Sequence, residues 1–166
     1  MEIESAVRRY LLGQSAVTSL VGQRVWKHEL YSPLDGTGQR AIVVARDGWH
    51  GPLEESRTVE FPVLAVTCWA DASRNADGMP AGENAADGAW GMHRVIDTLL
   101  HGQRDARWDR LVIVHCRRYA GPNLIRLGDV SGHEGAAGAR GTEERSVRGV
   151  RSLWAVEVGG TLPDDV

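Results

Sequence analysis

The sequence predicts an α+β fold: a mostly antiparallel sheet with helices packed on one face, joined by long Gly-rich loops. Two observations predict this class. Segments of strand type follow one another without a helix between them, which favours antiparallel neighbours because parallel strands need a long crossover. The 20 glycines lie mostly between the periodic segments. We expect one domain over residues 1–158 and a flexible C-terminal tail at residues 159–166.

The first 30 residues are predicted to form two short helices and a strand. Apolar residues at helical spacing predict a helix over residues 2–12, and Gly13 ends it. Ser15 is placed to cap a second short helix, which Gly22 ends. The segment RVWKHEL, residues 24–30, then has the composition of a strand.

The centre of the sheet is predicted at RTVEFPVLAVTCWAD, residues 57–71, the longest run of strand-forming residues. The preceding QRAIVVARD is a second strand that could pair with it as a hairpin with a long loop. Side chains alternate along a strand, so both faces of the central segment are largely apolar. Helices can cover one face, and the other is expected to need a partner. The residues assigned to that interface are Val63, Ala65, Thr67 and Trp69.

The second half is predicted to contain one helix and three strands. The helix begins near Glu83 and ends at Gly102, because apolar residues recur at spacings of four and three between them. LVIVHCRR and NLIRLG read as two strands on either side of a turn formed by AGPN. Residues 128–149 are predicted to be a long flexible loop, with order on contact as the alternative, and VRSLWAVEV closes the fold.

No arrangement of residues indicates catalysis, a cofactor or a metal ion. The six histidines form neither HExxH nor another ligand spacing, and GHEGAAGARG lacks the Lys-Ser/Thr ending of a phosphate loop. His115 and Cys116 are adjacent in a strand and so point to opposite faces, which argues against a nucleophile and its base. Cys68 and Cys116 lie in apolar runs, which favours buried reduced thiols over a disulfide.

Charge and hydropathy argue against two further classes of protein, tight DNA binders and membrane-spanning proteins. The net charge of −3 gives no basic excess for tight DNA binding, and no apolar run approaches the about 18 residues that cross a membrane. Trp49 and Trp108 stand in polar, loop-like surroundings and are predicted interface residues. The surface cations Arg117, Arg118 and Arg126 are candidates for lumen or loop contacts with a phosphate backbone, with solvated strand ends as the alternative.

In this order, the segments resemble the tail terminator family of long-tailed bacteriophages, also called tail completion or head-to-tail joining proteins. IESAVRRYLLGQSAVTSLVGQRVW is similar to the family's opening helix, small-residue corner and strand. FPVLAVTCWAD, followed by a helix that ends RVIDTLLHG, resembles the family's central strand and the helix after it. A closing strand like SLWAVEV is also usual, so the similarity spans most of the chain.

The resemblance implies a structural virion protein and no enzyme. Family members form a homo-oligomer, a hexameric ring that caps the tube of the major tail tube protein, ends its polymerisation and binds a head completion or connector protein. Genomic DNA passes through the ring with transient, non-specific contact. The expected location is the head–tail interface of the virion after assembly in the host cytoplasm, without a membrane. Another head–tail connector component, such as a head completion or minor tail protein, is the alternative, and an enzyme of unknown type is a third.

Overall fold

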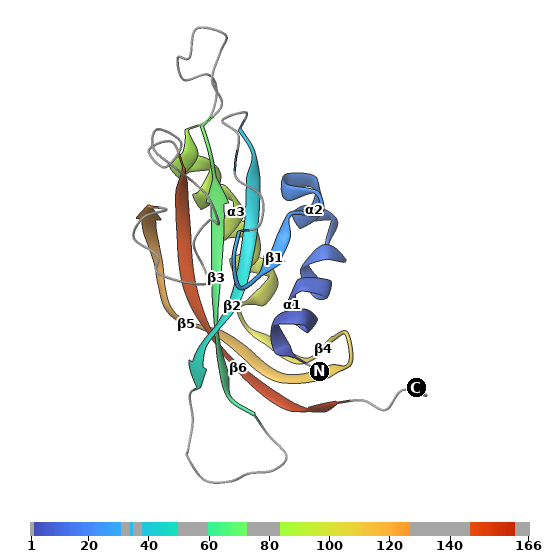
Figure 1. Ribbon diagram of the computed structural model, residues 1–166. Helices are drawn as coiled ribbons and strands as arrows, with labels where there is room; N and C mark the ends of the chain where they lie inside the picture. Colours follow the sequence, from blue (N-terminus) through green and yellow to red (C-terminus); the bar gives the residue numbers. More distant parts are fainter. Residues whose placement is uncertain are drawn as a thin grey trace, which may run out of the picture.

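Over the residues that it describes, the computed structural model is an α+β structure in which a curled six-stranded sheet carries three helices (Figure 1). It describes residues 2–30, 34, 38–49, 60–72, 84–126 and 147–161. Most of the predicted loop at 128–149 lies outside the described residues, as does the end of the predicted tail.

The sheet is antiparallel except at one edge. Its strands are β1 (Val25–Lys27), β2 (Arg40–Trp49), β3 (Pro62–Ala70), β4 (Gln103–Trp108), β5 (Leu111–Arg126) and β6 (Arg148–Thr161). They lie in the order β1-β2-β3-β6-β5-β4, and only the pair β1 and β2 is parallel. The predicted central strand is therefore confirmed, because β3 pairs with a strand on each side.

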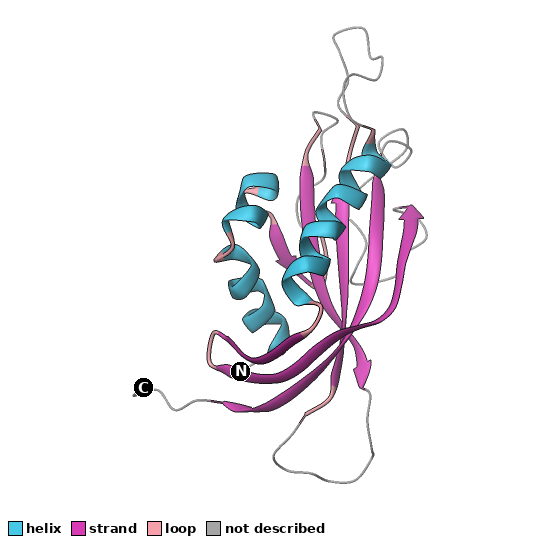
Figure 2. Cartoon of the chain, turned by 180° about the vertical axis from the view of Figure 1, so that it is seen from behind, coloured by secondary structure: helices cyan, strands magenta, loops and turns pink. Residues whose placement is uncertain are grey.

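All three helices cover the same face of the sheet (Figure 2). They are α1 (Ile3–Leu12), α2 (Ser15–Val21) and α3 (Ala85–Leu100). The α3 helix begins where the Asn84 side chain accepts a hydrogen bond from the Asp87 N–H at 2.9 Å, a cap that its sequence favours. Ser15 is not a cap: it is the first helical residue of α2, and Gln14 precedes it without a side-chain cap. The predicted layer of helices on one face is confirmed.

The larger hydrophobic cluster fills the space between the helices and the sheet. It joins the apolar stripes of α1 and α3 to alternate residues of β2, β3 and β6, including Leu64, Val66 and the indole of Trp154. Side chains at a spacing of two on the strands and of three or four on the helices meet there because both periods point one side toward this layer. This burial is the main force that holds the helices to the sheet.

The opposite face is also closed within the chain, which corrects the predicted intersubunit face. Val63, Ala65, Thr67 and Trp69 are each at most 5% exposed. A smaller cluster covers the Trp69 end of this face. Its buried members are Leu30, Leu34, Ala41, Val43, Trp69 and Val147. Residues from the connections between strands therefore cover this face, where the sequence predicted a neighbouring subunit.

The strand assignment differs from the sequence prediction in three places. β4 was not predicted, because its alternating residues are mostly exposed and it lacks an apolar stripe. The AGPN segment is not a turn: β5 runs through it, with register shifts against β6 between Arg118 and Asn123. Gly121 there has φ of 82°, a conformation that glycine adopts without strain. β6 extends to Thr161, so three residues of the expected tail belong to the sheet.

Replacing Gly149 by alanine should destabilise the fold. A Cβ atom at Gly149 would lie 2.8 Å from ring atoms of the buried Trp69, and overpacking of this kind costs about 1–3 kcal/mol. The matched control is Gly91→Ala on α3, where nothing lies within 4 Å of the added Cβ. That change should instead raise the free energy of unfolding by about 0.5–1 kcal/mol. Denaturant unfolding of both variants measures the difference, and equal effects would contradict the packing assigned to Trp69.

Both cysteines should resist modification in the folded protein. Burial raises the pKa of the Cys68 and Cys116 thiols to about 12, so the reactive thiolate is scarce at pH 8. Iodoacetamide at pH 8, followed by mass spectrometry, should label neither thiol in buffer and both in guanidinium chloride. Rapid labelling of the native protein would show that these strands open more readily than their burial indicates.

Candidate assembly interface

Along one edge of the sheet, the second half of β5 has a strand partner on one side only among the described residues. β4 pairs with β5 only from Trp108 opposite Leu111 to Gln103 opposite Cys116. Beyond that point β5 continues for ten more residues, paired with β6 on one side, while no described strand pairs with it on the other. Figure 1 shows this end of β5 at the left of the sheet. We call residues 117–126 the open edge.

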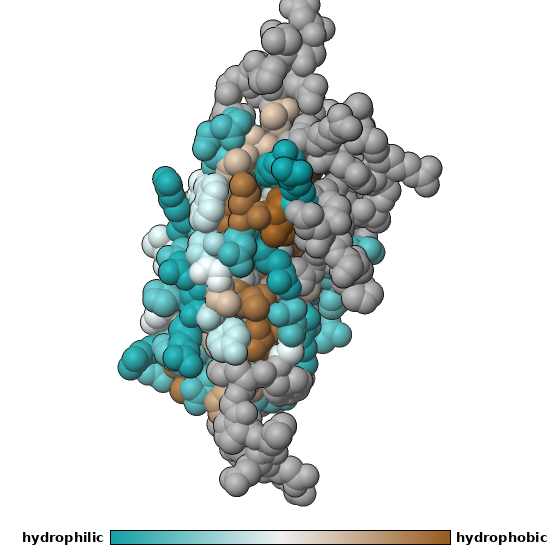
Figure 3. Space-filling view, turned by 90° about the vertical axis from the view of Figure 1, so that its left-hand side faces the viewer, coloured by the Kyte–Doolittle hydropathy of each residue, from teal (hydrophilic) through white to brown (hydrophobic). Residues whose placement is uncertain are grey.

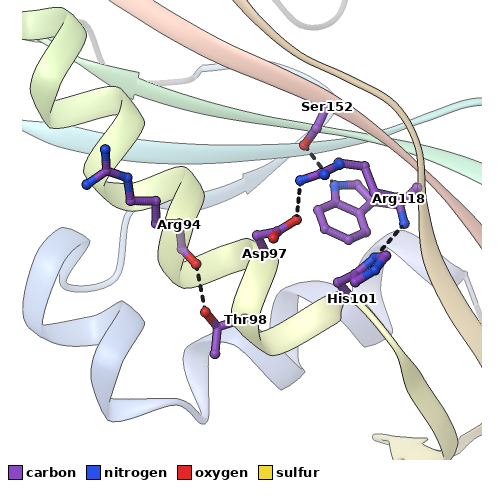
Figure 4. A network of polar contacts seen from close by, with 7 residues as sticks. Arg94, Asp97, Thr98, His101, Arg118 and Ser152 are labelled. Atoms are coloured by element: carbon purple, nitrogen blue, oxygen red, sulfur yellow. Dashed lines mark hydrogen bonds and ion pairs between the residues drawn. The ribbon is translucent and has the colours of Figure 1, made fainter.

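The open edge begins at a polar network that joins β5 to the end of α3 (Figure 4). The Gly102 N–H donates to the Cys116 carbonyl at 2.9 Å, and the Arg118 N–H donates to Nδ1 of His101 at 3.2 Å. The Arg118 guanidinium also donates to the carboxylate of Asp97 at 2.7 Å. These bonds satisfy the backbone of β5 where β4 leaves it and fix the position from which the open edge extends.

The buried Trp154 of β6 packs against this polar network. The His101 ring meets the Trp154 indole edge to face, with ring centroids 6.4 Å apart, and Trp154 Nε1 donates to Ser152 Oγ at 2.9 Å. The Arg118–Asp97 pair is about one-third exposed on each side chain, so it contributes only about 0.2–1 kcal/mol. Its main effect is therefore to orient Arg118 toward α3.

The open edge carries the two exposed large apolar side chains of the described residues. Tyr119 is 58% exposed and Leu124 is 50% exposed. Figure 3 views the side of the molecule that lies at the left of Figure 1, and apolar surface forms a column there beside hydrophilic side chains. In the sequence, RRYAGPNLIR places these two large apolar residues among arginines, a signal too weak to identify the surface on its own.

The structure places all three predicted arginines on this edge, at its two ends. Arg117, Arg118 and Arg126 are all exposed and all belong to β5. Arg117 is opposite Ala155 and Arg118 is opposite Trp154, so their side chains leave the sheet on opposite faces. Arg118 turns toward the helices and pairs with Asp97, which leaves Arg117 on the other face.

The two predicted interface tryptophans have different positions. Trp108 is not at the surface: it is fully buried at the end of β4 and stacks on Tyr10 of α1, with ring centroids 5.4 Å apart. The polar residues around it in the sequence concealed this contact, because Tyr10 lies far away along the chain. Trp49 is the last residue of β2, opposite Pro62. Its side chain lies outside the described residues, and its interface role stays a prediction.

The described residues bear on the metal-ligand and nucleophile arrangements that the sequence raised. Among them, no three His, Cys, Asp or Glu side chains come together as ligands for a metal ion. His115 and the buried Cys116 are opposite Glu157 and Val156 in the ladder with β6, so they face opposite sides of the sheet as predicted. Within the same residues, no helix is both long and apolar enough to cross a membrane.

Comparison with known proteins finds a similar fold among solved structures. No protein-family model matches the sequence, and no curated protein matches it. A solved structure that resembles the chain comes from the virion of a native gene transfer agent particle, with a TM-score of 0.57 and 15% sequence identity. The match covers 95% of both chains. The two chains share a fold. At this identity the likeness shows the fold alone, since one fold can serve many functions.

The stability of the fold should fall at mildly acidic pH because of His93. This residue is buried on α3, and burial lowers the pKa of its imidazole, an effect that the nearby Asp97 carboxylate partly opposes. In the unfolded chain the same imidazole takes up a proton near its usual pKa of about 6.5. The unfolded state therefore binds more protons below that pH, and the free energy of unfolding should decrease as pH falls from 7 to 5.

Denaturant unfolding of the wild type and of His93→Gln at pH 8, 7 and 5 tests the contribution of His93 to this loss of stability. The comparison at pH 8 gives the cost of the substitution itself, because His93 is neutral in both states there. Between pH 7 and 5 the variant should lose less stability than the wild type. Parallel curves for the two proteins would refute a contribution from His93.

Proposed function

We propose that the chain is a structural virion protein that forms a ring at the end of a phage tail tube. The observation that carries this proposal is the likeness to a chain of a gene transfer agent virion, which extends over 95% of both chains. The resemblance of the opening helices, the central strand and the closing strand to tail terminators supports the same role independently of the fold comparison.

The surfaces of the subunit support assembly over catalysis. Both faces of β3 are closed by the chain itself, and the described residues bring no three His, Cys, Asp or Glu side chains together as metal ligands. What the described part offers to other molecules is an edge with exposed apolar and cationic side chains. A contiguous apolar area on a surface is typical of protein contacts, and Figure 3 shows apolar surface on this side of the molecule.

In this role six copies form a closed ring on the finished tube of the major tail tube protein. The ring stops further addition of tube subunits and presents its other side to a head completion or connector protein. Genomic DNA passes through the lumen, and a subunit with a net charge of −3 supports this because it gives no strong attraction to phosphates. The alternative is another head–tail connector component, which would bind the connector but not tube ends.

Negative-stain microscopy of tail tubes, with and without the purified protein, tests the proposal. We expect ring-shaped density at one end of the tubes and shorter tubes when the protein is present during polymerisation. Tube protein alone is the control for length. A strictly monomeric protein that leaves tube ends and tube length unchanged would overturn the proposal, and selective pull-down of the connector without tubes would favour the alternative.

A further inference from the structure

We propose that the open edge of β5, residues 117–126, is the surface on which a second copy of this chain docks. The inference rests on the proposed ring function, for which it supplies one of the two surfaces that meet between neighbouring subunits. A closed ring joins two different patches of the same chain, so one such patch must exist on every subunit.

The two edges of the sheet differ in whether their outward backbone groups are hydrogen-bonded within the chain. At the β1 edge the chain occupies the outward backbone groups itself: the Val25 carbonyl accepts a hydrogen bond from Arg8 Nε at 2.7 Å. The Val25 N–H donates to the Gln23 carbonyl at 2.9 Å, and the Glu29 N–H donates to the Lys27 carbonyl at 2.8 Å. Sheet edges are commonly protected in such ways. By contrast, no described strand lies along the open edge after the contact of Arg118 with His101.

The side chains of the open edge have the composition of a contact between proteins. Tyr119 and Leu124 supply apolar surface that is at least half exposed, and arginines lie at both ends. Tyrosine and arginine are enriched at such contacts, and an apolar centre with a polar rim is a common arrangement. The apolar column beside hydrophilic surface in Figure 3 lies on this side of the molecule.

Charge complementarity indicates a second copy as the occupant. β5 contains three of the 19 basic residues of the chain and none of the 22 acidic ones. The remainder of the chain therefore has 16 basic and 22 acidic residues, a net charge of −6. Arg118 is already paired with Asp97, so the attraction of this strand for acidic surfaces of the same protein comes chiefly from Arg117. Attraction of this kind selects the partner and its orientation.

The contact is made mainly by side chains. Register shifts between Arg118 and Asn123 bend the strand, and Pro122 in the same stretch has no N–H to donate. A long continuous ladder with a neighbouring strand is therefore excluded along the open edge. DNA is a weaker occupant, because phosphates would use the arginines but would leave Leu124 exposed.

The test compares assembly of wild type with that of the double variant Arg117→Glu, Leu124→Glu. The matched control is Arg104→Glu with Ala16→Glu, two exposed positions on β4 and α2 that receive the same change of net charge. Thermal unfolding first establishes that both variants fold. Sedimentation velocity, or occupancy of tube ends if the ring forms only there, should then show roughly tenfold or greater weakening for the open-edge variant. The control should assemble as the wild type does.

Hydrogen exchange of the wild type locates the contact directly. We expect slower exchange in peptides that cover residues 117–126 on assembly. If the wild type assembles while the open-edge variant assembles equally well, or while these peptides stay unprotected, the docking site is wrong and the ring function stands. If the wild type neither assembles nor caps tubes, the ring function itself fails. Protection of residues 117–126 by a short DNA duplex, and not by assembly, would also overturn the second copy as occupant.

Discussion

The fold depends on β3, because all nine of its residues are buried. A strand buried on both faces requires a covering layer on each side, and burial of that apolar surface is the largest stabilising contribution available to a domain of this size. The helices form one layer. Leu30, Leu34 and Val147 form part of the other, over Trp69. The connections between strands are thus part of the core.

This closure determines which surfaces remain for assembly. A sheet with one bare apolar face would offer that face to a neighbour, and the sequence alone predicted such an arrangement. In the structure the residues of that face are at most 5% exposed, so direct contact through Val63 or Trp69 would require the covering residues to move away. Edges and strand ends are then the parts of the sheet that can meet another chain without disturbing the core.

The sequence predicted the elements whose signal is local. The helical stripe of α1, the helix start at α3 and the alternation along β3 depend on spacing within one segment, and all three were found where expected. Features that depend on distant partners were missed. β4 is held by its pairing with β5, and the buried Trp108 at its end stacks on Tyr10 from the other end of the chain.

The sequence likewise predicted only part of the candidate interface. The arginines of β5 stood out in the sequence, but Tyr119 and Leu124 did not. An apolar residue in a strand is normally assigned to the core, and its exposure follows from the position of that strand at the edge of the sheet. The GPN segment added to the error: Gly121 and Pro122 read as a turn, whereas a glycine with positive φ lets β5 pass through without reversing.

The charge of β5 also bears on the symmetry of any assembly. Two copies that met through the same edge, in a two-fold arrangement, would bring Arg117 and Arg126 of one strand toward the arginines of its partner, without an acidic residue on either strand. Like charges placed opposite each other are destabilising, so this pairing is disfavoured. Contact with a different, acidic surface of a neighbour removes the repulsion. The same arginines that would oppose a two-fold dimer are therefore compatible with the proposed ring, in which two different surfaces meet head to tail.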